Sequence, residues 1–174
     1  MTADTPAMTI AALRPSDLPA ALALQAESYP PFLVEAEAAF ASRMTLAATY
    51  SLAARRDGVL LGYLLAHGWA EQSPPPVGTV LAEGVPSEVL FIHDLAVSSA
   101  GRGLGIGEAL IGHAFQGAAR DGLRRAELIA VEGAAAYWRR LGFTAAATSG
   151  ALAEKVATYG PHACWMARDI PPSG

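Results

Sequence analysis

The sequence predicts a single mixed α/β domain built on a central mixed sheet. Its 174 residues suit one domain, and 52% of them are apolar, which is enough to build a core without disulfides. A predicted hairpin comes first and alternating helices and strands follow, so we expect both antiparallel and parallel strand pairs. The chain shows no internal repeat and no domain-sized linker. We therefore expect one domain over residues 9–170, with tails at 1–8 and 171–174.

The first part of the chain predicts an edge strand and two helices. Residues 9–13 form a short apolar run that suits an edge strand. A helix is expected over about 16–28, because its first residues, Ser and Asp, can accept hydrogen bonds from free backbone N–H groups. Pro30 and Pro31 end it, since proline cannot continue a helix. A second helix is predicted over about 35–44.

The middle of the chain predicts a hairpin and a further strand. Residues 49–56 and 59–69 read as strands joined by the two-residue turn Asp57-Gly58. The second of these strands is apolar almost throughout, so it should be central and covered on both faces. A proline-rich loop at 72–78 follows, and residues 89–97 form another apolar strand.

The last part of the chain alternates helices and strands. A glycine-rich turn at 98–103 leads into a helix from Gly105 to about Arg120. The remaining predicted elements are a strand at 126–131, a short helix at 134–141 capped by Gly142, and strands at 143–147 and 163–170.

The composition excludes several classes of protein. The net charge is −4, with 12 basic and 16 acidic residues, so the strong basic field of a nucleic-acid-binding protein is absent. The longest apolar stretch, Val59–Ala70, is too short for a membrane helix. Cys164 is the only cysteine, which rules out an intramolecular disulfide and a cysteine-based zinc site. We expect a cytoplasmic protein with no metal, nucleic-acid or membrane partner.

The turn before the helix at 105–120 has the pattern of a diphosphate site. Four alternating glycines and one arginine stand between a buried strand and a helix: Gly101, Arg102, Gly103, Gly105 and Gly107. Glycine lets the backbone approach an anion closely, and the first helical turn offers unpaired N–H groups. The guanidinium adds a charge suited to phosphate. A tight turn without a ligand is the alternative interpretation.

Two common phosphate loops do not fit this turn. The P-loop needs lysine followed by serine or threonine at the helix start, where this chain has Ile106, Gly107 and Glu108. The dinucleotide pattern G-x-G-x-x-G fails from Gly101 and from Gly103, because its last position is not glycine. A nucleotide-binding module is therefore disfavoured.

Three segments together resemble the GCN5-related N-acetyltransferase (GNAT) superfamily. Residues 102–107 are similar to its R-G-x-G-[IV]-G signature, and residues 136–143 to its A-x-F-Y-x-x-x-G-F segment. The strand at 91–97 resembles the family's fourth strand. The resemblance covers about 9–170 and is specific over 89–143. It implies a sheet with helices on both faces and with splayed fourth and fifth strands.

The resemblance also implies acetyl-CoA as the acetyl donor, held where the two strands diverge. Backbone groups along Leu95, Ala96 and Val97 are then expected to pair with the pantetheine arm. The other cofactor-binding residues that it implies are Arg102, Gly103, Leu104, Gly105, Ile106, Gly107 and Trp138.

Trp138 departs from the family pattern, which commonly has a tyrosine there that can protonate the departing thiolate. An indole N–H is only a donor and is no useful acid. Tyr137 precedes it, but one step along a helix turns the side chain by roughly 100°. An acid role for Tyr137, direct release of the thiolate and a bound water therefore stay open.

His93 and Asp94 interrupt the strand at 89–97 and are the candidate bases. Acetylation needs a neutral amine, and a base removes its proton, often through water. Imidazole needs little tuning for this role. Neighbouring residues of a strand face opposite sides, so we expect at most one of the two in the cleft. A hydrogen-bonded pair that ties the strand to a neighbour is the alternative.

Four residues are candidates for binding the acceptor: Tyr29, Phe32, Glu35 and Trp69. The first three lie in the connection between the two N-terminal helices, which borders the acceptor site in the resembled family. The fourth lies near the end of a central strand. Core packing or plain solvent exposure is the alternative for each. Glu132 could face the acyl pocket, but a carboxylate at a helix N-terminus is the favoured interpretation.

We therefore predict an acetyl-CoA-dependent N-acetyltransferase that transfers acetyl directly to an amine of a small molecule or peptide. A non-catalytic acyl-CoA-binding sensor domain is the alternative, and Trp138 is its main support. Dimers are common among resembling proteins, so a homodimer is a further hypothesis.

Overall fold

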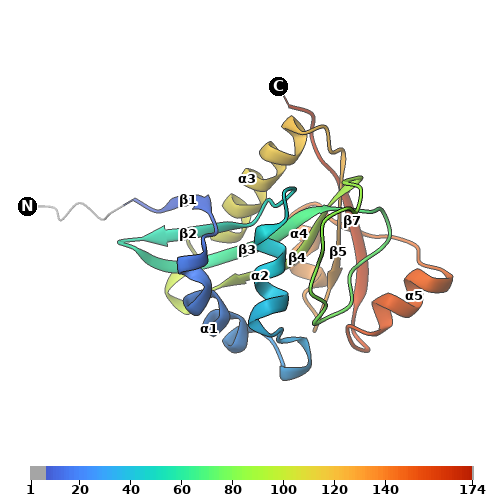
Figure 1. Cartoon of the computed structure of the whole chain (residues 1–174), viewed down its shortest axis with the longest axis horizontal. Helices are drawn as coiled ribbons and strands as arrows, with labels where there is room; N and C mark the ends of the chain where they lie inside the picture. Colours follow the sequence, from blue (N-terminus) through green and yellow to red (C-terminus); the bar gives the residue numbers. More distant parts are fainter. Residues whose placement is uncertain (1–6, 174) are drawn as a thin grey trace, which may run out of the picture.

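A computed structural model describes residues 7–173, which form a mixed seven-stranded sheet with helices on both faces (Figure 1). The strands are β1 (Thr9–Ala12), β2 (Leu52–Arg56), β3 (Val59–Trp69), β4 (Val89–Val97), β5 (Arg125–Ala130), β6 (Thr144–Ala145) and β7 (Cys164–Asp169). The helices are α1 (Leu18–Ser28), α2 (Glu37–Thr45), α3 (Ile106–Arg120), α4 (Ala135–Arg140) and α5 (Gly150–Ala157). Short 3-10 turns are η1 (Pro15–Asp17), η2 (Pro31–Leu33) and η3 (Ser99–Gly101).

The strand order is β1-β2-β3-β4-β5-β7-β6, and β4–β5 is the parallel pair among otherwise antiparallel neighbours. The predicted mixed α/β fold is confirmed. The turn between β2 and β3 contains Asp57 and Gly58, both with positive φ, as a two-residue hairpin requires. β3 is buried along most of its length, because the sheet continues on both sides and helices cover both faces.

Helix α5 is absent from the sequence-based prediction. Its sequence has little of the apolar pattern that predicts a helix. The helix is short and begins at a glycine, and its buried residues are Leu152 and Val156. These two side chains pack against Phe91 and Trp165, so tertiary contacts hold the helix in place. The chain passes through α5 before β7 inserts between β5 and β6.

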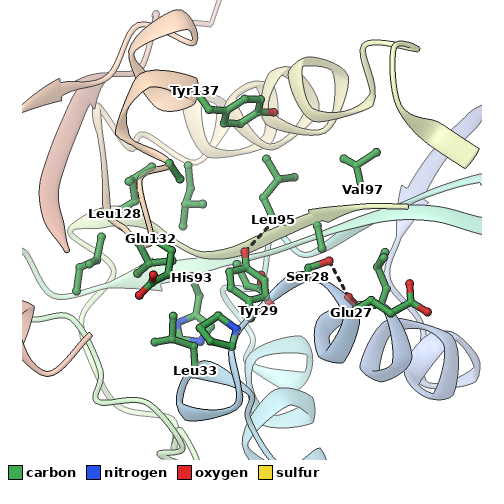
Figure 2. Close-up of a pocket in the computed structure, with 18 of the residues that line it drawn as sticks. Glu27, Ser28, Tyr29, Leu33, His93, Leu95, Val97, Leu128, Glu132 and Tyr137 are labelled. Carbon is green, nitrogen blue, oxygen red and sulfur yellow. Dashed lines mark hydrogen bonds between the residues drawn. The ribbon is translucent and has the colours of Figure 1, made fainter. Parts of the chain in front are cut away.

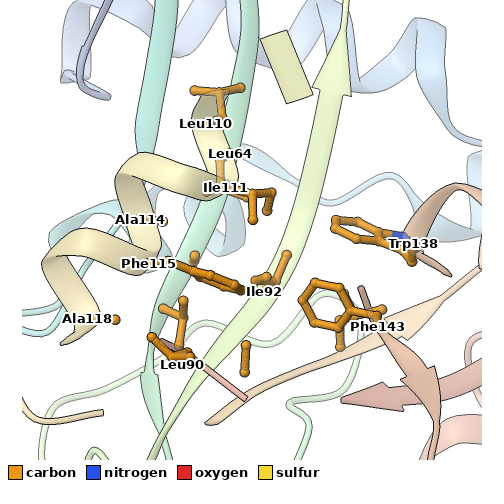
Figure 3. Packing of buried hydrophobic residues seen from close by; sticks show 14 of the residues in the cluster. Leu64, Leu90, Ile92, Leu110, Ile111, Ala114, Phe115, Ala118, Trp138 and Phe143 are labelled. Atoms are coloured by element: carbon orange, nitrogen blue, oxygen red, sulfur yellow. The ribbon is translucent and has the colours of Figure 1, made fainter. Parts of the chain in front are cut away.

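The two faces of the sheet carry different helices. Helices α3 and α4 cover one face, which we call the α3 face (Figure 1). Its core joins Leu110 and Phe115 of α3 to Leu90 of β4, and Trp138 and Phe143 extend it (Figure 3). Helices α1, α2 and α5 cover the other face, which we call the α1 face. Among the described residues, no helix is long and apolar enough to cross a membrane.

Strands β4 and β5 pair over only three residues and then diverge, as expected. Leu90–Ile92 pairs with Ala126–Leu128, whereas β4 continues to Val97 without this neighbour. The separation leaves one side of β4 without a strand partner. This opening positions the candidate site.

Candidate active site

A bulge in β4 turns both candidate bases toward the α1 face. The pairing with β3 shifts between Leu65 and Ala66, so that His93 is an extra residue on β4. The ring of His93 lies 6.1 Å from that of Phe91 on this face, and Asp94 points to the same side. The expectation that at most one of the pair faces the cleft is therefore wrong. Neighbouring strand residues normally face opposite sides of a sheet, but the bulge adds one residue to β4 and brings His93 and Asp94 to the same side.

A cavity of about 620 Å³ lies where β4 and β5 diverge. It is lined from both faces of the sheet. Figure 2 shows Tyr137 on one side of β4, with Tyr29 and His93 on the other. Most of the predicted site residues line it: Tyr29, Glu35, His93, Asp94, Leu95, Ala96, Val97, Arg102, Tyr137 and Trp138. Its volume is that of a small-molecule site.

Two predicted acceptor residues do not line this cavity. Trp69 donates from its indole N–H to the Ser73 carbonyl at 2.9 Å and packs edge-on against His67. Phe32 is 53% exposed at the rim and its ring edge lies against Gly160. His67 is buried, which lowers its pKa to about 3, so it stays neutral in the core.

The glycine turn leaves the start of α3 open. Gly105 is the N-cap of α3 with φ +70°, and Gly103 has φ +78°, a region that favours glycine. No side chain caps the helix, so N–H groups of its first turn are left for a ligand. Arg102 lines the cavity beside this turn. The arrangement fits a pyrophosphate.

The other two glycines of the motif are required for close packing. A Cβ on Gly101 would lie 2.7 Å from Ile106 Cδ1 and 3.0 Å from the Leu61 carbonyl oxygen. A Cβ on Gly107 would overlap the hydroxyl of Tyr137. The motif therefore meets two requirements, an open helix start and close approach of neighbouring segments.

The free edge of β4 exposes backbone groups to the cavity. Ser98 donates its N–H to the Leu61 carbonyl at 2.8 Å, so alternation turns the backbone groups of Val97 and Leu95 away from β3. The Tyr29 hydroxyl donates to the Leu95 carbonyl at 2.9 Å, and the other groups face the opening. This edge suits an extended amide-containing arm.

Asp94 is a buried carboxyl at the centre of the cavity wall. The Tyr63 hydroxyl donates to its Oδ2 at 2.5 Å, while Oδ1 is buried without a partner. Burial raises the pKa of Asp94, although the neighbouring hydroxyls of Tyr29 and Tyr63 oppose the shift. The same burial, and then the charge of Asp94, raises the pKa of both tyrosines.

Glu35 connects three segments of the chain on the α1-face side of the cavity. Its Oε2 lies 3.0 Å from Arg43 Nη2 of α2 and accepts from the Gly78 N–H at 2.9 Å. Its Oε1 is paired with Nε2 of His93, whose Nδ1 is buried without a partner. Burial raises the pKa of Glu35, but the hydrogen bond and charge of His93 and the charge of Arg43 outweigh it and lower the pKa. Glu35 is therefore ionised at neutral pH.

Arg43 and Tyr63 complete this site and are absent from the sequence-based prediction. Arg43 is fully buried and follows the buried Ala39 and Phe40 at helical spacing, which is a usable signal for a paired charge. Tyr63 lies within an apolar strand, where nothing in the sequence distinguishes it from a core residue.

Trp138 and Tyr137 take different positions on α4. Trp138 is 8% exposed and packs edge-on against Phe143, with ring centroids 5.4 Å apart (Figure 3). Tyr137 is half-buried, with its hydroxyl beside Gly107 in the first turn of α3. Burial, and then the charge of Glu108, raises the pKa of Tyr137, so the phenol keeps its proton at neutral pH.

Comparison with protein families identifies the chain. Residues 18–143 match the acetyltransferase (GNAT) family. The chain belongs to the GNAT family. It is therefore an acyltransferase, and acetyl-CoA is the donor that the family implies. The uncapped start of α3 and the free edge of β4 fit this donor.

Solved structures share the GNAT fold at low sequence identity. The ribosomal-protein-S18-alanine N-acetyltransferase from Escherichia coli is 21% identical, with a TM-score of 0.68 and coverage of 97% of each chain. Ard1 from Thermoplasma volcanium is 14% identical, with a TM-score of 0.70 and coverage of 95% of this chain and 99% of its own. Arabidopsis thaliana Naa50, bound to the bisubstrate analogue CoA-Ac-MVNAL, is 16% identical, with a TM-score of 0.65 and coverage of 92% and 96%. No curated protein sequence matches the chain.

Proposed function

We propose that this enzyme transfers an acetyl group from acetyl-CoA directly to an amine nitrogen of a small molecule or peptide. One observation carries the proposal. The cavity between β4 and β5 joins the free edge of β4 and Arg102, in the turn before the uncapped start of α3, to a buried Glu35–His93 pair on the α1 face. Donor and acceptor can thus meet through the opening in the sheet.

The donor side is formed by the α3 face. Backbone groups of Leu95 and Val97 would hold the pantetheine arm, and the turn from Arg102 to Gly107 would hold the pyrophosphate. Bound acetyl-CoA supplies the acetyl group as a thioester. Holding both reactants in one narrow opening lowers the entropic cost of their encounter.

His93 is the base in this proposal. A neutral imidazole donates from one nitrogen and accepts at the other. Glu35 accepts at its Oε1 from Nε2–H of His93, which leaves Nδ1 to take the proton that the amine loses. The amine nitrogen forms the new C–N bond as the C–S bond breaks, and the products are an amide and the CoA thiol. Asp94 instead accepts from the Tyr63 hydroxyl and holds Tyr63 in place beside the cavity.

Tyr137 gives the proton that the departing thiolate needs. It is the protonated hydroxyl on the donor side of the cavity, and its raised pKa keeps that proton in place until sulfur leaves. Trp138 packs in the core and has no acidic proton to give. The support for this role is thus the position of the phenol and its protonation.

The proposal is tested first by calorimetric titration with acetyl-CoA, with NAD and ATP as controls. Thiol release is then measured with a panel of amines. His93→Gln should lower kcat/KM by about a hundredfold or more, the usual contribution of a general base. His113→Gln, an exposed position on α3, is the matched control. Binding of acetyl-CoA without thiol release from any amine would favour the sensor domain instead.

We also propose a cellular compartment and an oligomeric state for the protein. A reducing, cytoplasmic location is supported by Cys164, the one cysteine of the chain, which is a free thiol. The homodimer stays a prediction. Size-exclusion chromatography with light scattering would measure it.

A further inference from the structure

Several connections meet around the cavity on the α1 face. The Tyr159 hydroxyl after α5 donates to the Pro75 carbonyl in the β3–β4 loop. The same loop is held to the α1–α2 connection through the Gly78 N–H and Glu35. Gly160 touches Phe32 of that connection and Glu132 of the β5–α4 connection. These connections border the α1-face side of the cavity, and we call the point where Phe32, Gly160 and Glu132 meet its entrance.

Glu132 is held in an uncommon backbone conformation at this entrance. Its φ is +47°, and the following Gly133 also has a positive φ of +82°. Non-glycine residues seldom adopt this region, and they cluster at functional sites when they do. Glu132 lines the cavity together with His93, and Figure 2 shows it on the opposite side of β4 from Tyr137. Within residues 7–173, Glu132 has no ion pair and accepts no hydrogen bond.

Phe32 presents an exposed aromatic ring to the same point. The position that a Cβ on Gly160 would take lies 3.3 Å from Phe32 Cζ and 3.5 Å from Glu132 Oε1. The ring and the carboxylate therefore both lie against Gly160, close to each other. A carboxylate attracts a cation by its charge, and an aromatic ring adds a cation–π contact to a cation over its face.

The charges around the cavity favour a cationic acceptor. On the acceptor side, Glu27 and Glu132 line the cavity without basic partners among the described residues. The charge of Glu35 is offset by the buried guanidinium of Arg43. Arg102 also lines the cavity, but it lies in the donor-side turn before α3. Among the described residues that line the cavity, no lysine or arginine on the α1-face side competes for Glu132.

Two buried polar atoms on residues that line the cavity favour a polar ligand at this position. Nδ1 of His93 and Oδ1 of Asp94 are both buried without partners, on side chains that are at least nine-tenths buried and line the cavity. Leaving such atoms unpaired costs stability unless a ligand meets them. An amine that enters past Glu132 would meet both.

We propose that the acceptor is a small dicationic amine, with one amine acetylated at His93 and the second positive charge bound between Glu132 and Phe32. This inference rests on the proposed function, because it names the substrate class of the same site. It assigns Glu132 and Phe32 as specificity-determining residues. The reacting nitrogen loses its proton at His93, while the second ammonium keeps its charge.

The test measures binding of amines without turnover. The protein is saturated with CoA and titrated calorimetrically with 1,4-diaminobutane and, as the singly charged match, with butylamine. The diamine should bind about fivefold to tenfold more tightly, as expected from one partly exposed ion pair and one cation–π contact. Glu132→Gln should bring the ratio of the two dissociation constants close to one, and Phe32→Leu should reduce it in part. Glu154→Gln, an exposed position on α5, should keep the wild-type ratio.

The outcomes separate this inference from the proposed function. Equal affinities for the two amines, an unchanged ratio in Glu132→Gln, or no diamine binding at millimolar concentration would each overturn the inference. Acetylation of butylamine and of the diamine with equal kcat/KM would overturn it as well, while the acetyltransferase function stands. Tighter diamine binding with no thiol release from acetyl-CoA would instead contradict the proposed function.

Discussion

The buried ion pair between Glu35 and Arg43 should be a major determinant of stability. Both side chains are almost fully buried, with exposures of 2% and 0%, and their charged atoms lie 3.0 Å apart. Glu35→Gln keeps the shape of the side chain but leaves the Arg43 guanidinium without a countercharge. Taking one partner from a buried pair costs about 3–5 kcal/mol, because the remaining charge is uncompensated.

This loss is a large part of the stability of a single domain. Folded domains are stable by about 5–15 kcal/mol, so Glu35→Gln should remain folded but unfold at a much lower denaturant concentration. Arg43→Met should cost a similar amount. The double variant should cost about 2 kcal/mol less than the sum of the two, because neither charge is then left alone.

The effect of Glu35 also depends on pH in a defined direction. Its pKa is lowered in the folded protein, so the unfolded chain takes up its proton first as the pH falls. The stabilisation is therefore present above the unfolded value of about 4.3 and is lost as the pH drops through the folded value. The difference between the wild type and Glu35→Gln should shrink on acidification below about pH 4.

Denaturant unfolding followed by tryptophan fluorescence measures these differences at pH 7 and at about pH 3, below the unfolded pKa of a glutamate. Glu154→Gln is the matched control, because Glu154 is exposed on α5 and forms no ion pair among the described residues, so its loss should cost only about 0–1 kcal/mol. A loss below about 1 kcal/mol in Glu35→Gln, or strict additivity in the double variant, would refute the reasoning.

Two further predictions concern the donor side. Arg102→Ala should weaken acetyl-CoA binding by about tenfold in calorimetry, since a charged phosphate contact is lost; Arg120→Ala, beyond the donor turn, should not. Gly107→Ala should weaken acetyl-CoA binding because its Cβ overlaps the Tyr137 hydroxyl, and the double variant with Tyr137→Phe should recover that affinity. An unchanged affinity in the first case, or no recovery in the second, would contradict these assignments.

Local sequence patterns were sufficient for most of the fold. The hairpin turn at Asp57-Gly58 and the glycine turn before α3 depend on backbone conformations that few residues adopt. The presence of these residues in the sequence is therefore enough to predict both turns. Helix α5 shows the opposite case. Its two buried side chains pack against Phe91 of β4, far away in the chain, and against Trp165 of β7, and no helical repeat in the sequence indicates these contacts.

The donor half of the site could likewise be predicted from the order of strand, glycine turn and helix. The acceptor half could not. His93 and Asp94 face the same side only because β4 takes an extra residue in its pairing with β3, and a register is a property of two strands rather than one. Glu35 becomes a buried partner of His93 only when α2 brings Arg43 against it, since a carboxylate without a countercharge would not stay ionised there. The chain alone thus specified the enzyme family and its glycine turn, whereas packing between distant segments decided which groups line the cavity on the α1 face.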